Sequence, residues 1–230
     1  MSLSLDENRR ASLRLWPLRL VLVILGLAAW FGTQWMIGHR PFPEGLIGDY
    51  LLDLTEPANA FLHANSIWKR GLLIASSAII DLLGVFLLAS AVVGPSLRPF
   101  VGLLLIFSLR QICQGLCALP PPPGMIWEHP GFPSLLVTYG VSNDLFFSGH
   151  TALAVFGTSE LARLKGRIWP VVGLAMALFE IAAVIVLRAH WTMDVFAGAV
   201  TALLIASLVD RIAPACDRAI AACWPSASRH

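Results

Sequence analysis

Charged side chains are scarce in this chain. Only 13% of its 230 residues are Asp, Glu, Lys or Arg, whereas 57% are hydrophobic. Ordinary globular domains carry about 25% charged residues, so this composition excludes a typical water-soluble domain. It indicates an integral membrane protein instead.

Cysteine pairs, internal repeats and low-complexity segments are also lacking. The four cysteines include no Cys-x-x-Cys pair, and Cys113 and Cys117 lie one helical turn apart in an apolar stretch. That spacing is typical of small buried thiols and indicates neither a disulfide framework nor a cysteine-based zinc site. Without a repeat, a single domain over residues 1–230 is the simplest expectation.

The N-terminal region lacks the small-residue cleavage site of a secretory signal peptide. Residues 1–15 are polar and predict a cytoplasmic tail, and the apolar stretch 18–38 that follows contains bulky Trp35 and Met36 near its end. The apolar core of a signal peptide is shorter than this stretch. We therefore expect it to be retained as the first membrane span.

Six hydrophobic segments have about the 20 residues that cross a bilayer as a helix. The predicted spans are 18–38, 71–93, 99–118, 145–164, 168–187 and 191–212. Spanning segments must satisfy their own backbone polar groups, which makes helices the expected structure. The predicted fold is therefore an all-α integral membrane protein with six transmembrane helices.

Basic residues are distributed unevenly between the two sides of this predicted bundle. Eleven lie on the side of the N-terminus and four on the other side, which favours cytoplasmic positions for both termini. The loop 119–144 and the turn at Arg188–His190 then face the extracytoplasmic side. A short multi-pass chain of this kind is expected in a bacterial cytoplasmic membrane.

Two short stretches combine side chains that suit phosphoryl transfer. His150 and Ser148 lie near the start of the fourth predicted span, and His190 and Asp194 lie one turn apart at the start of the sixth. One histidine can attack phosphorus while a carboxylate orients it, and a second can move the proton of the oxygen. We assign His190 as the nucleophile, Asp194 as its orienting group and His150 as the acid and base.

Four further residues are predicted to bind substrate. They are Arg110, Asp144, Ser148 and His129. Ser148 offers a hydroxyl and an amide at a helix N-terminus, where anions such as phosphate are favoured. Asp144 either caps the fourth helix or orients His150. His129 lies in the proline-rich loop, residues 119–144, where it can contact a lipid headgroup.

Other interpretations of the polar residues stay open. Arg110, which lies inside a span, either neutralises a lipid phosphate or pairs with Asp81 or Glu180 of neighbouring spans. A zinc site is a rival to the histidine mechanism, with His129 or Asp144 as a third ligand. No metal or cofactor is required by the assigned chemistry.

The outer loops contain two more features with alternative interpretations. In loop 39–70, Leu46, Tyr50 and Leu54 repeat at four-residue spacing, which predicts either an interfacial helix or a loop packed on the helix ends. Trp127 and Tyr139 are either ordinary interfacial aromatics or a cage for a quaternary ammonium group.

The stretches Ser148-Gly-His-Thr151 and His190-Trp-Thr-Met-Asp194 resemble the two signature blocks of the sphingomyelin synthase family. The stretch from Arg110 through Leu119-Pro120 to Pro123-Gly124-Met125 resembles a third block of that family. Ser142-Asn143 replaces the Cys-Gly of the family, and Trp191 replaces a Tyr. The Lys-x6-Arg-Pro block of lipid phosphatases is absent, since Ala91 stands at the Lys position before Arg98-Pro99.

This resemblance implies a helical core like that of lipid phosphate phosphatases and a metal-independent phosphotransferase. The enzyme would move phosphocholine or phosphoethanolamine from a glycerophospholipid to ceramide or a similar lipid alcohol through a phosphohistidine, releasing diacylglycerol. Its partners would be the phospholipid donor and ceramide or diacylglycerol, with no nucleic acid.

The sequence leaves several alternatives to this function open. Water as the acceptor would make the chain a lipid phosphatase or a phospholipase C-like hydrolase. A lipid transporter or membrane scaffold would use Arg110, Asp81 and Glu180 as a polar pathway. Assembly into a homo-oligomer is also left open.

Overall fold

The computed structural model describes residues 15–39, 47–131, 134–139 and 145–223, and every regular element in these residues is a helix. The helices are α2 (Trp16–Gly38), α3 (Tyr50–Leu54), α4 (Glu56–Ala64), α5 (Ser66–Val93), α6 (Arg98–Leu116), α7 (Gly149–Leu161), α8 (Ile168–Val186) and α9 (Thr192–Cys223). The prediction of an all-α integral membrane protein is confirmed.

Five of these helices are long and apolar enough to cross a membrane, namely α2, α5, α6, α8 and α9. The fourth predicted span, 145–164, is instead α7, which has 13 residues. Helix formation starts late because Ser148 has extended backbone angles and serves as the N-cap, and it ends at Leu161. Most of α7 is buried against α5, α8 and α9, so irregular backbone before it is shielded by protein.

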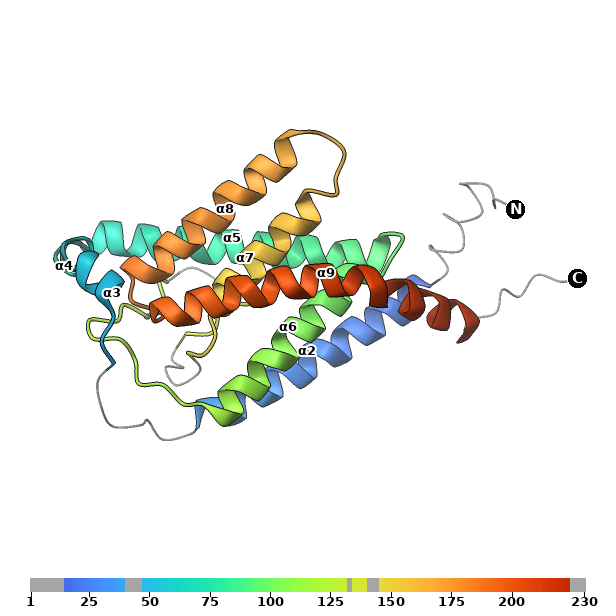
Figure 1. Ribbon diagram of the computed structural model, residues 1–230, viewed down its shortest axis with the longest axis horizontal. Helices are drawn as coiled ribbons and strands as arrows, with labels where there is room; N and C mark the ends of the chain where they lie inside the picture. The colour runs from blue at the N-terminus through green and yellow to red at the C-terminus, as the bar shows by residue number, and fades with distance from the viewer. Residues whose placement is uncertain (1–14, 40–46, 132–133, 140–144, 224–230) are drawn as a thin grey trace, which may run out of the picture.

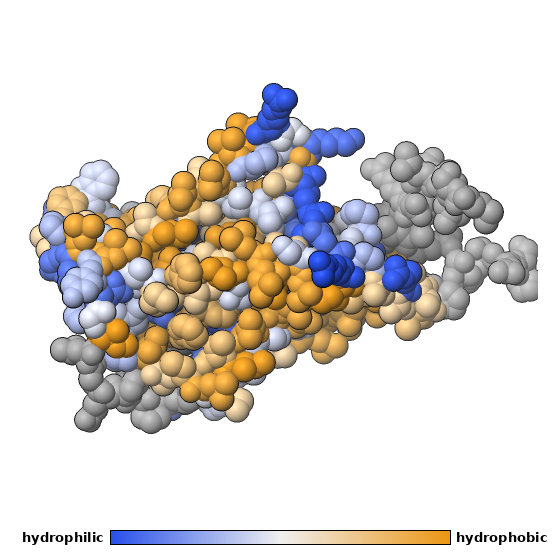
Figure 2. All heavy atoms as spheres, in the orientation of Figure 1, coloured by the Kyte–Doolittle hydropathy of each residue, from blue (hydrophilic) through white to orange (hydrophobic). Residues whose placement is uncertain are grey.

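The connections that carry the candidate site gather at one end of the bundle. Figure 1 shows α3, α4 and the connection from α8 to α9 together at this end. At the other end, Asp217 of α9 accepts hydrogen bonds from the Ser96 hydroxyl and the Leu97 amide at 2.6 and 2.8 Å. Figure 2 shows hydrophobic side chains over the middle of the visible face, as expected for contact with lipid.

The connection between α2 and α5, predicted as the first outer loop, contains two short helices, α3 and α4, that pack on the ends of longer ones. Leu52 and Leu62 are buried in a cluster with Leu187 and Trp191, which supports the packed-loop interpretation for this face. Tyr50 is nevertheless 92% exposed, so the other face remains available to the membrane interface.

Arg188, in the connection between α8 and α9, binds several segments at this end of the bundle. Its buried guanidinium donates to the Pro123 carbonyl at 2.6 Å and to the Leu52 carbonyl at 3.0 Å, and it pairs with Glu56. Arg188 has a positive φ of 53°, which is uncommon for a residue with a side chain. The side chain thus joins α3, α4 and the proline-rich loop to the residues that precede His190.

Small residues allow α7 and α8 to approach closely. A Cβ atom on Gly173 of α8 would lie 2.9 Å from the Thr158 Cα of α7, and the Thr158 hydroxyl donates to the Gly173 carbonyl at 2.7 Å. Such close packing stabilises helix pairs in membranes, where the hydrophobic effect does not drive association.

Replacing Gly173 with Leu should therefore separate α8 from α7. We expect the variant to lose roughly 1–3 kcal/mol of stability from overpacking, measured as a lower midpoint of thermal unfolding in detergent. Ala175→Leu is the matched control, because Ala175 is on the exposed face of the same helix. Equal midpoints for the two variants would contradict the close packing.

Candidate active site

The N-terminal ends of α7 and α9 are in backbone contact. The Ser148 amide donates to the Asp194 carbonyl at 3.0 Å, and a Cβ atom on Gly198 would lie 2.6 Å from the Ser148 carbonyl oxygen. His150 is in the first turn of α7, and His190 lies just before α9. This contact brings the two predicted histidines to the same cavity.

His190 and Asp194 are arranged as the spacing predicts. The His190 Nδ1 atom is 3.7 Å from Asp194 Oδ2, and the Asp194 side chain is completely buried. The same carboxylate oxygen accepts a hydrogen bond from the Trp191 amide at 3.0 Å, which fixes its position at the start of α9. A carboxylate facing Nδ1 favours the tautomer in which Nδ1 carries the proton, so the other ring nitrogen, Nε2, is the basic one.

Several buried polar atoms of the site have no hydrogen-bond partner among the described residues. They are His150 Nε2, His190 Nδ1 and Asp194 Oδ1. Buried polar atoms are normally paired, and exceptions concentrate where a substrate binds or reacts. The His150 ring is held in place by the indole of Trp127, whose ring centroid is 5.2 Å away in an edge-on arrangement.

Arg110 supplies a positive charge beside the start of α7. Its Nε atom donates to the Phe147 carbonyl at 2.8 Å, and Nη1 lies 3.5 Å from Gln34 Oε1. A Cβ atom on Gly149 would be 3.2 Å from Nε, so the glycine leaves room for the guanidinium. A cation together with a helix N-terminus attracts an anion such as a phosphate.

The acids proposed as alternative partners of Arg110 are engaged elsewhere. Asp81 accepts hydrogen bonds from the amides of Leu135 and Leu136 at 2.8 and 2.9 Å, which ties the outer loop to α5. Glu180 accepts a hydrogen bond from the Ser76 hydroxyl at 2.7 Å. Both acids therefore serve contacts between segments.

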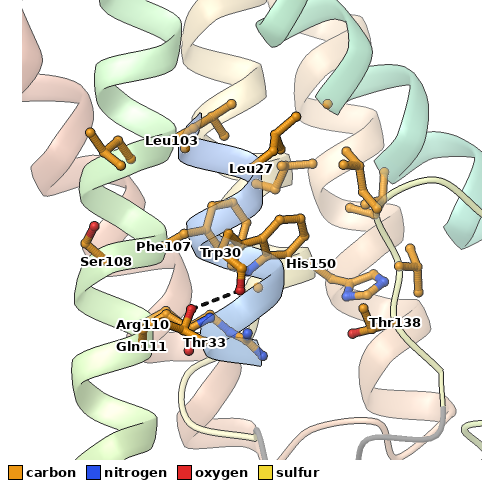
Figure 3. A pocket seen from close by; sticks show the side chains of 18 of the residues that line it. Leu27, Trp30, Thr33, Leu103, Phe107, Ser108, Arg110, Gln111, Thr138 and His150 are labelled. Carbon is orange, nitrogen blue, oxygen red and sulfur yellow. Dashed lines mark hydrogen bonds between the residues drawn. The ribbon is translucent and has the colours of Figure 1, made fainter. Parts of the chain in front are cut away.

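A cavity of about 360 Å³ extends from this polar cluster into the bundle. Figure 3 shows Arg110, Gln111 and Thr33 near one end and Leu27 and Leu103 near the other. Along α6 the lining residues run from Phe100 to Ile112, which corresponds to about 18 Å of helix. One polar end and a long apolar remainder match the shape and chemistry of a lipid.

The other three predicted binding residues are Ser148, His129 and Asp144, and none of them lines the cavity within the described part of the chain. Ser148 is buried, its amide is used by Asp194 and its hydroxyl oxygen accepts from the Thr151 amide, so Ser148 caps α7. His129 is exposed and lies outside the residues that line the cavity. Asp144 lies outside the described residues.

The zinc alternative lacks a third ligand in the described part of the chain. No group of three or more His, Cys, Asp or Glu side chains is placed there to hold a metal ion. His129 instead accepts a hydrogen bond from the Gly131 amide at its Nδ1 atom.

Gln111 lines the polar end of the cavity and Gln34 contacts it from α2, and neither glutamine was predicted. Gln34 is buried in α2, and its Oε1 atom accepts from Gln111 Nε2 at 3.2 Å. A glutamine within an apolar span is a signal for a buried polar contact, but its partners in α6 become evident only from helix packing.

Asp49 joins the first outer loop to the start of α9. Its carboxylate accepts hydrogen bonds from the Thr192 amide and hydroxyl at 2.6 and 2.7 Å, and from the amides of Leu51 and Leu52 at 3.1 and 3.3 Å. Burial raises the pKa of this carboxyl, but the four hydrogen bonds outweigh that effect, and the pKa lies below its ordinary value. The charged form therefore holds the helix that carries Asp194.

These features define a class of protein: an integral membrane protein with two histidines and an arginine on one lipid-sized cavity. A family model described as AtPDCT1/2 matches residues 49–211, and the chain belongs to this family of phosphatidylcholine:diacylglycerol cholinephosphotransferases. The chain is accordingly a lipid phosphotransferase. Neither a comparison with curated proteins nor one with solved structures found a match.

The assignment to the sphingomyelin synthase family is wrong. The matched family is a related but different group of phosphotransferases. The short blocks around His150 and His190 carried the resemblance, and short motifs of this kind do not identify the lipid acceptor. Ceramide as the acceptor therefore has no support from the family match.

Replacing Gly149 with Ala should displace the Arg110 guanidinium by a few tenths of an ångström. We expect a roughly ten-fold loss of phosphotransfer, since small misplacements of binding groups reduce rates. Initial rates in lipid nanodiscs measure it, with Gly32→Ala as the control, because a Cβ atom there meets nothing within 4 Å. An unchanged rate would show that Arg110 does not need its present position.

The Asp49 carboxylate should make stability depend on pH. Because its folded-state pKa is lowered, its stabilising effect is present above the unfolded-state pKa, about 3.9, and is lost as pH falls through the folded-state value. Asp49→Asn should be less stable than the parent near neutral pH and should lose less stability on acidification.

Thermal unfolding midpoints between pH 7 and 3 test this expectation. Asp53→Asn is the control, since Asp53 is an exposed acid in the same short helix. Parallel pH profiles for the parent and Asp49→Asn would contradict the assigned role.

Proposed function

We propose that the chain exchanges phosphocholine between phosphatidylcholine and diacylglycerol. The observation that carries this proposal is the placement of His150, His190 and Arg110 on one lipid-sized cavity, with the Asp194 carboxylate beside His190 Nδ1. The family match supports the choice of both lipids.

In the first half-reaction, His190 Nε2 attacks the phosphorus of phosphatidylcholine. The bond from phosphorus to the glycerol oxygen breaks, and His150 donates a proton to that oxygen. Diacylglycerol leaves, and phosphocholine stays on His190. Arg110 stabilises the negative charge of the phosphoryl oxygens, and Asp194 stabilises the positive charge that develops on the His190 ring.

The second half-reaction reverses these steps with another diacylglycerol. His150 takes the proton of its hydroxyl, and the resulting oxygen attacks phosphorus while the bond to His190 breaks. The apolar walls formed by Leu27, Leu103 and Phe107 hold the hydrocarbon part of either lipid. One cavity therefore serves donor and acceptor in turn.

The charge distribution supports an extracytoplasmic position of this site. Arg163, Lys165 and Arg167 are exposed in the connection from α7 to α8, which follows the end of α7 remote from His150. An excess of basic residues marks the cytoplasmic side of membrane proteins. The histidines then open toward the opposite leaflet.

His190→Gln should abolish headgroup exchange, with a loss of at least about 10³-fold, because the nucleophile is removed. The assay supplies unlabelled phosphatidylcholine and labelled diacylglycerol and measures labelled phosphatidylcholine. His39→Gln is the control, since His39 is an exposed histidine at the end of α2.

Two outcomes of this assay would contradict the proposal. Undiminished exchange by the His190→Gln variant would contradict the assignment of His190 as the nucleophile. Release of free phosphocholine, or transfer to ceramide in preference to diacylglycerol, would identify a different acceptor.

A further inference from the structure

Trp127 forms part of the cavity wall next to the reacting histidines, and the mechanism above does not use it. It lies in the connection between α6 and α7 and lines the same cavity as His150 and His190. With its ring centroid 5.2 Å from that of His150, it is close to where the transferred phosphoryl group must lie. A headgroup attached to that phosphorus extends over this part of the wall.

The orientation of the indole is fixed before any lipid binds. Its Nε1 atom donates to the Thr138 carbonyl at 3.2 Å, and the Tyr139 ring packs against it with centroids 5.0 Å apart. Tyr139 is fixed in turn by a 2.5 Å hydrogen bond between its hydroxyl and that of Ser77 in α5. A binding surface held in this way loses little conformational freedom on binding.

Two acids near Trp127, neither of which lines the cavity, are engaged in contacts of their own. Glu128, the neighbour of Trp127, pairs with Lys69 at 2.6 Å. Asp81 accepts hydrogen bonds from the amides of Leu135 and Leu136. Within the described residues, this wall therefore offers a cation an aromatic ring in preference to an uncommitted carboxylate.

An aromatic wall distinguishes between the common cationic headgroups. A quaternary ammonium has no N–H group and is attracted by the electron-rich face of an aromatic ring, with tryptophan the strongest of the side chains. A primary ammonium has three N–H donors, and each loses a hydrogen bond to water unless the protein offers an acceptor. The wall around Trp127 suits the first kind of cation.

We propose that the Trp127 indole binds the quaternary ammonium of the choline headgroup and is the residue that selects choline over ethanolamine. This inference rests on the proposed function, because it places the phosphoryl group between His150 and His190. Tyr139 acts through Trp127 as a positioning residue, since its own ring packs behind the indole.

The test is a competition between phosphatidylcholine and phosphatidylethanolamine with identical acyl chains, in nanodiscs with labelled diacylglycerol. Trp127→Leu should lower the ratio of choline to ethanolamine transfer about ten-fold, equivalent to about 1.4 kcal/mol. Trp127→Phe keeps an aromatic face and should restore most of the ratio. Trp68→Leu, at an exposed tryptophan of α5, should leave it unchanged.

A second measurement separates this inference from the proposed function. The His190→Gln variant, which lacks the nucleophile, should bind phosphatidylcholine more tightly than phosphatidylethanolamine in native mass spectrometry. Adding Trp127→Leu should remove that preference. If Trp127→Leu left the preference for choline unchanged in both experiments, or lowered transfer and binding equally for both lipids, the proposed role of Trp127 would be overturned. Exchange by the parent chain would still support the proposed function.

Discussion

The contact between the start of α7 and the first turn of α9 is the constraint on which the candidate site depends. One backbone hydrogen bond joins Ser148 to Asp194, and Gly198 allows the two backbones to approach. His150 follows Ser148 by two residues, and His190 precedes Asp194 by one turn. Fixing the two helix starts against each other therefore fixes both histidines without a direct bond between their rings.

Side chains at the same end of the bundle hold this contact in place. Asp49 caps the short helix α3 and also binds Thr192, and Arg188 joins the proline-rich loop to α3 and α4. Both side chains satisfy backbone groups that helix ends and loops leave unpaired. The polar groups outside the cavity are thus paired with one another, whereas His150 Nε2, at the cavity, has no hydrogen-bond partner among the described residues.

The sequence predicted the membrane class and the five long helices, and it left Arg110 open between a lipid phosphate and an ion pair within the bundle. The structure places Arg110 on one cavity with His150 and His190. Hydropathy overestimated the length of α7, because it does not distinguish a short helix buried by its neighbours from a full membrane span. The family was also misassigned, since motifs that surround the reacting residues describe the chemistry and carry little information about the lipid acceptor.

By itself, the sequence determined which segments are apolar and which residues can react, because hydropathy and side-chain chemistry are properties of each residue. The proximity of His190 and Asp194 is also local, since only four residues separate them at the start of α9. Only the tertiary structure decided that Ser148 caps α7, that Gln34 faces Gln111, and that Trp127 lies against His150. These contacts join segments far apart in the chain, and their distances depend on how the helices pack rather than on any local pattern.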